Sequence, residues 1–266
     1  MTKCYYRRLP RSESRADDLQ VFESTDLTRS NWTADIQHGS PPLALLTKAI
    51  EERLEGTGLR IGRLGLDILG AIPVAPLTVR SWTPRPGKRI ALVAAEMAPV
   101  DDPDRPVARV NAWALATSDT ADGATDRYSP LIEVPAIGLP DYWWNAPGYL
   151  DSVSWRRQPD DPSGAAVWWL RPEVGLVDDE PTTALQRLAM VVDSANGVGS
   201  AVSPEDYMFM NTDTVVHLHR LPTGSDFALR ARGSIGPDGI GVTTAEVFDR
   251  DGFVGTSAQT LLVQKR

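Results

Sequence analysis

The chain has 266 residues, of which 42% are hydrophobic and 23% charged, and it contains 8 tryptophans. These values are typical of a folded protein with a sizeable core. Its formal net charge of -8 gives no general attraction to polyphosphate, so nucleic acid is not an expected partner. The single cysteine, Cys4, excludes an internal disulfide. Because the sequence contains neither a membrane-spanning apolar run nor a signal-peptide pattern, we expect a cytoplasmic protein without membrane insertion.

The first half of the sequence combines one helix pattern with several strand patterns. Residues 1–18 are expected to form a loosely held lead, followed by a strand at 21–25. A helix is predicted with Ser40 as its N-cap and Pro41 at its first helical position. Its apolar stripe consists of Leu43, Leu46, Ile50 and Leu54, and glycines 56 and 58 end it. Alternating residues then predict antiparallel strands at 63–72, 77–82, 89–97 and 107–117.

Residues 118–164 interrupt this rhythm with many prolines and are interpreted as a linker. The linker carries large aromatic residues, too many for a solvated tether, so most of it should pack against the body. Among them are Tyr142, Trp143, Trp144, Tyr149 and Trp155. A strand at 166–170 and a helix at 181–195 follow. Further strands are predicted at 212–221, 227–234, 241–249 and 254–264.

The second half repeats the order of the first. The segment Leu69–Pro73 is answered by Leu218–Pro222 about 149 positions later, and both prolines end an alternating run. A repeat of this length indicates two fused small domains, because solenoid repeats are only about 20 to 50 residues long. The predicted fold class is therefore α+β, with one helix wrapped by a bent antiparallel sheet in each of two tandem repeats.

Four motifs resemble one known family. They are His38-Gly39-Ser40-Pro41-Pro42-Leu43-Ala44-Leu45-Leu46, Val192-Asp193-Ser194-Ala195-Asn196-Gly197, Asn211 to Arg220, and Ser257-Ala258-Gln259-Thr260. Their order and spacing over residues 20–264 resemble the acyl-CoA thioesterase II (TesB-like) family, particularly its actinobacterial-type members. The resemblance implies a double hotdog fold with repeats at 19–117 and 165–266. It also implies hydrolysis of fatty acyl-CoA by an activated water, without a covalent intermediate and without a cofactor.

Candidate catalytic residues lie in the second half. Asp193 is a carboxylate at the edge of the apolar stripe of the second helix, where it needs a partner. Gln259 interrupts an apolar strand, and the matching residue of the first half is Ala112. The resemblance assigns water activation to Asp193 and a share of that water to Gln259. Where relatives have a threonine this chain aligns with Asn211, so either Asn211 or the adjacent Thr212 completes the site.

Other interpretations of the same residues remain open. Asp193 is alternatively a surface carboxylate, Gln259 an outward strand residue, and Asn211 and Thr212 turn formers. His38 and Gly39 precede a helix whose amides suit a carbonyl oxygen or phosphate, although a simple helix-start turn also explains them.

The sequence predicts no metal site and leaves alternative functional classes. His217 and His219 share a strand face but lack companion ligands, so no metal site is predicted. A non-catalytic acyl-CoA-binding protein is the main alternative function. A hydratase or dehydratase is disfavoured, because the sequence lacks an Asp/His proton-transfer motif. Assembly into a homo-oligomer is expected.

Overall fold

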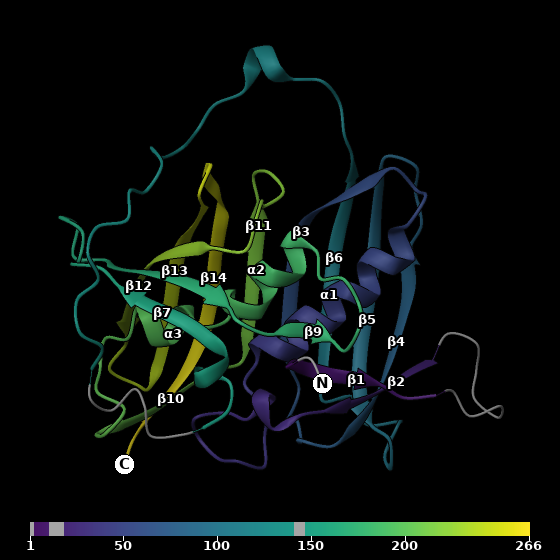
Figure 1. Ribbon diagram of the computed structural model, residues 1–266, viewed down its shortest axis with the longest axis horizontal. Coiled ribbons are helices and arrows are strands. Elements are labelled where there is room, and N and C mark those ends of the chain that lie inside the picture. Colours follow the sequence, from purple (N-terminus) through teal and green to yellow (C-terminus); the bar gives the residue numbers. More distant parts are fainter. Residues whose placement is uncertain (1–2, 11–18, 141–146) are drawn as a thin grey trace.

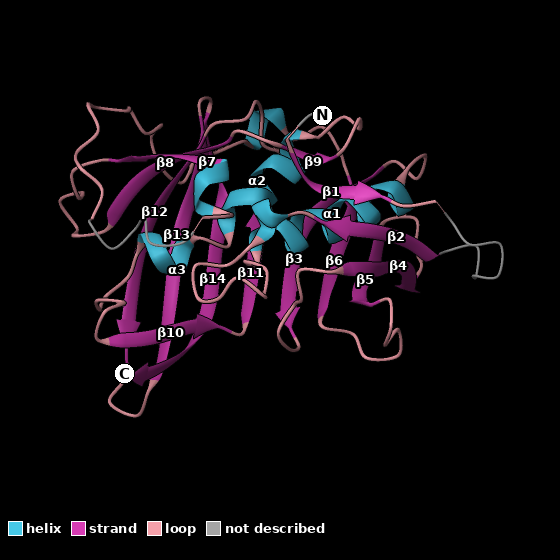
Figure 2. Ribbon diagram, turned by 60° about the horizontal axis from the view of Figure 1, so that its bottom comes forward, coloured by secondary structure: helices cyan, strands magenta, loops and turns pink. Residues whose placement is uncertain are grey.

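The computed structural model describes residues 3–10, 19–140 and 147–266. In these residues one long, strongly curved sheet wraps around the helices, which lie together on its concave side (Figures 1 and 2). The strand path in sheet order is β7-β8-β12-β13-β14-β11-β3-β6-β5-β4-β2-β1-β9, and β10 pairs with β14 off this path. The helices and the concave face of the sheet enclose the main hydrophobic core.

The elements follow the predicted order, and the structure adds β1, β7, β9, α3 and β10. Those before the linker are β1 (Cys4–Arg8), β2 (Leu19–Ser24), α1 (Ser40–Leu54), β3 (Leu59–Ile68), β4 (Pro76–Arg85), β5 (Ile90–Pro99) and β6 (Ala108–Ala116). Those after it begin with β7 (Val153–Arg157), β8 (Ala166–Pro172), β9 (Gly175–Val177), α2 (Ala184–Val192) and α3 (Ala195–Val198). The last are β10 (Tyr207–Asn211), β11 (Asp213–Leu218), β12 (Phe227–Ile235), β13 (Ile240–Asp249) and β14 (Gly252–Lys265).

Two parts of the sheet have the same strand order. In chain order a strand, a helix and four strands give the sheet order β2-β4-β5-β6-β3 in the first half and β8-β12-β13-β14-β11 in the second. Equivalent cross-strand ion pairs occupy the two halves, Arg80 with Glu96 and Arg230 with Glu246. The halves join where β11 pairs antiparallel with β3. This arrangement is consistent with a double hotdog.

Helix α1 forms as the apolar stripe predicts, but its first residue differs from the expectation. Gly39 is the N-cap and Ser40 is already helical, so the prediction of Ser40 as N-cap is wrong by one residue. The Ser40 hydroxyl makes no capping bond and instead contacts Tyr149, while the Ser40 backbone N–H donates to His38 Nδ1 at 3.1 Å. A tertiary contact therefore replaces the local cap.

The second predicted helix is two helices. Thr183 and Gln186 form a capping box that starts α2, and Glu51 of α1 accepts hydrogen bonds from both side chains. The helix then stops at Val192 with Asp193 as its C-cap, and only the short α3 follows. Asp and Ser are weak helix formers that compete for backbone hydrogen bonds. The expected continuous helix over 181–195 is therefore wrong at both ends.

The predicted N-terminal lead contains a strand. Tyr5 and Tyr6 of β1 are fully buried, and β1 pairs antiparallel with β2 and parallel with β9. The expectation of a loosely held segment is wrong for residues 4–8, since this strand spans the two halves on the side away from the β3–β11 seam. A run of five residues shows too few alternations for this strand to be predicted from the sequence.

The predicted linker has two parts in the structure. Residues 118–140 are mostly exposed, and their first part arches away from the body in Figure 1. Tyr128 and Leu131 nevertheless pack against a buried cluster of the second half, and Glu133 pairs with Arg156. From residue 147 on the chain packs tightly, with Tyr149, Leu150 and Trp155 buried and β7 added to the sheet. The last part of the predicted linker thus packs on the body, whereas its first part contacts the body through only a few side chains. Tyr142, Trp143 and Trp144 lie outside the described residues.

An ion cluster ties β1 to α1. Glu180, just after β9, accepts hydrogen bonds from Arg8 of β1, and Lys48 of α1 lies 2.8 Å from its second carboxylate oxygen. The hydrogen bonds from Arg8, and next those from Lys48, lower the pKa of Glu180 to about 2. Because the folded-state pKa lies below the unfolded one, the cluster stabilises the protein fully above the unfolded value near 4.5.

Glu180→Gln should therefore flatten the acid limb of the stability curve. The wild-type protein loses this stabilisation as the pH falls from near 4.5 towards 2, whereas the variant lacks it at every pH. We expect the difference in free energy of unfolding between pH 6 and pH 3 to shrink by about 1 kcal/mol, as for a partly exposed ion cluster. Urea denaturation at each pH measures this. Glu173→Gln, in an exposed pair with Arg171, is the control, and an equal change there would contradict the assignment.

Candidate active site

Asp193 is a buried carboxylate at the end of α2. Its side chain is only 2% exposed. Gly39, immediately before α1, approaches it so closely that a Cβ on residue 39 would overlap Asp193 Oδ2. The missing side chain at residue 39 therefore lets the start of α1 meet the end of α2 at this carboxylate.

Three side-chain donors converge on one oxygen of Asp193. The Thr214 hydroxyl donates to Oδ1 at 2.5 Å, Asn211 Nδ2 at 2.8 Å and Gln259 Nε2 at 3.3 Å. Gln259 Nε2 also donates to the backbone carbonyl oxygen of Asp193 at 2.8 Å and lies 2.9 Å from the Thr214 hydroxyl oxygen. Burial of a carboxylate is costly unless it is hydrogen-bonded, so this network keeps Asp193 buried.

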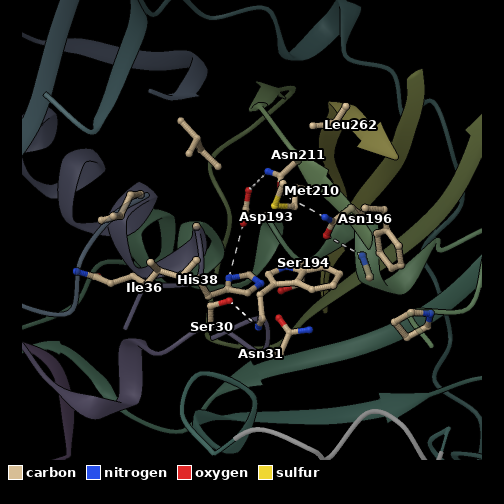
Figure 3. A pocket seen from close by; sticks show the side chains of 18 of the residues that line it. Ser30, Asn31, Ile36, His38, Asp193, Ser194, Asn196, Met210, Asn211 and Leu262 are labelled. Carbon is tan, nitrogen blue, oxygen red and sulfur yellow. Dashed lines mark hydrogen bonds and ion pairs between the residues drawn. The ribbon is translucent and has the colours of Figure 1, made fainter. Parts of the chain in front are cut away.

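The other carboxylate oxygen has a different environment. Within the described parts of the chain, no hydrogen bond reaches Asp193 Oδ2, and His38 Nδ1 lies 3.7 Å away from it, too far for a hydrogen bond. Figure 3 shows the carboxylate between His38 on one side and Asn211 on the other. Oδ2 is thus an atom of this cluster with unused acceptor capacity, and so is Gln259 Oε1, which is buried without a hydrogen-bond partner among the described residues.

His38 is held as a neutral imidazole. Its Nδ1 accepts the Ser40 backbone N–H at 3.1 Å, which leaves the proton on Nε2. Burial lowers the pKa of His38, and the charge of Asp193 opposes that effect only in part. His38 therefore contributes one N–H donor to its surroundings.

The polar cluster exists in one half only. Thr214 lies on β11 and Gln259 on β14, two neighbouring strands of the second half. The corresponding strands β3 and β6 carry Leu64 and Ala112 opposite each other, and both are buried. The two halves thus present a polar pair and an apolar pair at equivalent places, as the contrast between Gln259 and Ala112 predicts.

The structure brings together most of the predicted site residues. Hydrogen bonds connect Asp193 to both Asn211 and Gln259, and Asn211 also bonds to Thr214. On the other side of the carboxylate, His38 and Gly39 flank Asp193 Oδ2. Thr212 does not join them, because its exposed hydroxyl lies 3.4 Å from Asp213 Oδ1. Burial excludes the alternatives of a surface carboxylate for Asp193 and an outward strand residue for Gln259.

Sequence reasoning missed Thr214 and Asn196. The chain leaves the sheet pattern at Thr212, between β10 and β11, so Asn211 and Thr214 face Asp193 although they are three positions apart. Strict alternation from Asn211 would point Thr214 the other way. Asn196 Nδ2 donates to Asn211 Oδ1 at 3.3 Å and orients that amide.

A pocket of about 670 Å³ opens beside the cluster. His38, Gly39, Asp193 and Asn211 line it, with Ser194 and Asn196 nearby (Figure 3). The rest of its wall is largely apolar and comes from both halves, including Trp32, Ile36, Ile68, Ile72, Leu150, Trp155, Phe209 and Leu262. A buried carboxylate at the side of a partly apolar pocket is a typical enzyme site.

The residues that the structure describes hold neither a metal-binding cluster nor a membrane-spanning helix. Over 3–10, 19–140 and 147–266, no group of three His, Cys, Asp or Glu side chains is placed to hold a metal ion. None of the helices in those ranges has the length and apolarity needed to cross a membrane.

Solved structures with the same architecture define the class. A protein of Alicyclobacillus acidocaldarius described as having a hot dog fold is 14% identical, with a TM-score of 0.69 over 94% of this chain and 95% of that chain. Acyl-CoA thioesterase II TesB2 from Mycobacterium marinum is 13% identical, with a TM-score of 0.69 over 96% of each chain. A protein of Novosphingobium aromaticivorans assigned as a thioesterase is 18% identical, with a TM-score of 0.70 over 97% and 98%. The fold is that of the hotdog proteins.

Family models identify the chain more closely. The acyl-CoA thioesterase N-terminal domain matches residues 28–115 and the acyl-CoA thioesterase C-terminal domain matches residues 132–263. The chain therefore belongs to the acyl-CoA thioesterase family and is a thioester hydrolase, as the resemblance predicts. None of the curated proteins matches the sequence.

Thr214→Val should impair hydrolysis, whereas Thr212→Val should not. Valine keeps the volume of Thr214 but removes the donor to Asp193 Oδ1, so we expect at least a tenfold lower kcat with acyl-CoA, as for a lost orienting group. Thr78→Val removes a comparably buried hydroxyl, bonded to the Ala98 carbonyl of the first half, and controls for stability. Release of free thiol measures turnover. Equal rates for the Thr212 and Thr214 variants would contradict this geometry.

Proposed function

We propose that the protein hydrolyses acyl-CoA to a free fatty acid and CoA by direct attack of water, with Asp193 as the general base. The observation that carries this proposal is the difference between the two oxygens of Asp193. Oδ1 is saturated by Thr214, Asn211 and Gln259, whereas Oδ2 lies beside the pocket without a hydrogen bond from the described residues. An ionised, oriented carboxylate with one free oxygen suits proton removal from water.

The proposed reaction balances with one water molecule. Asp193 Oδ2 takes a proton as the water oxygen attacks the thioester carbonyl carbon. The tetrahedral intermediate then expels the CoA thiolate, which receives that proton, and Asp193 returns to the carboxylate. No group of the protein forms a bond to the acyl carbon. Gln259 and Thr214 hold the base and Gln259 also shares the water, the role that the resemblance implies for it.

The N-terminus of α1 offers a binding site for the thioester carbonyl oxygen. The Ser40 N–H is used by His38, Pro41 and Pro42 have none, and the Leu43 N–H bonds to the Gly39 carbonyl. The Gly39 N–H is therefore the amide of this turn without a partner among the described residues. At a helix N-terminus such a donor stabilises developing negative charge.

The apolar wall of the pocket suits an acyl chain, and the pocket lies between the two halves. We further infer that the two halves arose as tandem repeats with boundaries near 19–117 and 165–266. A cytoplasmic location and assembly into a homo-oligomer stay predictions of the sequence.

Asp193→Asn should lower kcat by about 10² or more, because asparagine keeps the shape but cannot take the proton. Gln259→Ala should cause a loss of similar size, since it removes the donor to both Asp193 and Thr214. The assay is release of free CoA thiol from an acyl-CoA series.

Asp249→Asn is the matched control. This carboxylate is equally buried but bonds to Arg220 and Thr223, away from the pocket. It should lose stability without a comparable loss of kcat. Near-wild-type turnover in both Asp193→Asn and Gln259→Ala would refute the proposed mechanism.

A further inference from the structure

Tyr149, a residue of the linker segment, is packed against the proposed site. Its ring is fully buried and stacks on the His38 imidazole with centroids 3.9 Å apart and planes 11° from parallel. Trp155 meets the same ring edge-on at 6.1 Å, and Tyr5 of β1 lies 6.2 Å from it. The Tyr149 ring thus covers one face of His38, and its own aromatic neighbours hold that ring in one orientation.

The Tyr149 hydroxyl joins the two helix ends that meet at Asp193. It donates to the Met190 carbonyl oxygen at 2.8 Å and lies 2.8 Å from Ser194 Oγ, at the end of α2. It also lies 3.1 Å from Ser40 Oγ, in the first turn of α1. The Met190 carbonyl is one of the last four of α2, which have no partner within the helix. One hydroxyl therefore satisfies the end of α2 and fixes it against α1.

The backbone around Tyr149 is itself fixed. The Tyr149 N–H donates to the Arg29 carbonyl at 3.0 Å, and the Ser152 hydroxyl donates to the Tyr149 carbonyl at 2.6 Å. Gly148 has a φ of +142°, and a Cβ there would overlap Arg29. The close approach to Arg29 thus needs glycine at residue 148, and it leaves the ring of Tyr149 little freedom to move.

We propose that Tyr149 is a positioning residue for hydrolysis, holding His38 by its ring and the Asp193 end of α2 by its hydroxyl. This proposal rests on the proposed function. Tyr149 does not line the pocket, so it acts through its neighbours and not on the substrate. A displacement of about 1 Å in a reacting group is enough to lower a rate severely.

The environment of His38 provides a readout that is independent of turnover. The titratable groups facing its imidazole are Asp193, from the end of α2, and Tyr149, from the linker. Burial is the main cause that lowers the pKa of His38, and the stacked ring supplies part of that burial. A variant without the ring should admit water and raise the pKa of His38.

The test compares Tyr149→Phe, Tyr149→Leu and Tyr128→Phe. Phenylalanine keeps the stacked ring and deletes the hydroxyl, so kcat should fall about tenfold with KM nearly unchanged and with the wild-type His38 titration. Leucine deletes both, so kcat should fall by about 10² and the His38 pKa should rise. Tyr128→Phe deletes the hydroxyl of another linker tyrosine, which bonds to Glu246 and does not line the pocket, and should retain the wild-type kcat and the wild-type His38 titration.

Nuclear magnetic resonance follows the histidine titrations directly. The chain has only 3 histidines, so His217 and His219 serve as internal references. Wild-type kcat in both Tyr149 variants, or an equal fall of kcat in Tyr128→Phe, would overturn the proposal. Absence of hydrolysis by the wild-type protein would instead refute the proposed function, while an unchanged His38 titration in Tyr149→Leu would separately overturn the positioning role.

Discussion

The site depends on one buried carboxylate and the donors that keep it buried. Removing a charged carboxylate from water costs several kcal/mol unless hydrogen bonds replace the lost solvent. Asp193 receives them from Asn211, Thr214 and Gln259, which belong to three different strands. This requirement fixes where α2 ends, how the β10–β11 segment runs and which side of β14 faces the helix. The carboxylate thereby organises the second half of the protein around itself.

The two halves share a strand order but not a chemistry. At the seam β11 pairs with β3, so the helix ends of both halves face the same region. Where the second half has Thr214 and Gln259, the first has Leu64 and Ala112. The first half therefore contributes the start of α1, with Gly39 and His38, and one wall of the pocket. The two halves therefore contribute different residues to the same site.

Segments far apart in the sequence complete the surroundings of Asp193. The last part of the linker brings Tyr149 onto His38 and the end of α2, while β1 brings Tyr5 to the other side of Tyr149. Both segments lie outside the repeated helix-and-strand units. Their contribution is to hold two helix ends together where neither helix offers an internal hydrogen-bond partner.

The sequence by itself determined the elements with strong periodicity and the contrast between the halves. The stripe of α1, the long strands, and the carboxylate and amide of Asp193 and Gln259 all follow from local pattern, because burial of one face imposes a period of 3.6 or 2. Only the tertiary structure decided that Thr214 and not Thr212 reaches Asp193, that α2 stops there, and that Tyr149 covers His38. Those outcomes depend on contacts between residues 21 to 109 positions apart, and periodicity within a single element carries no information about them.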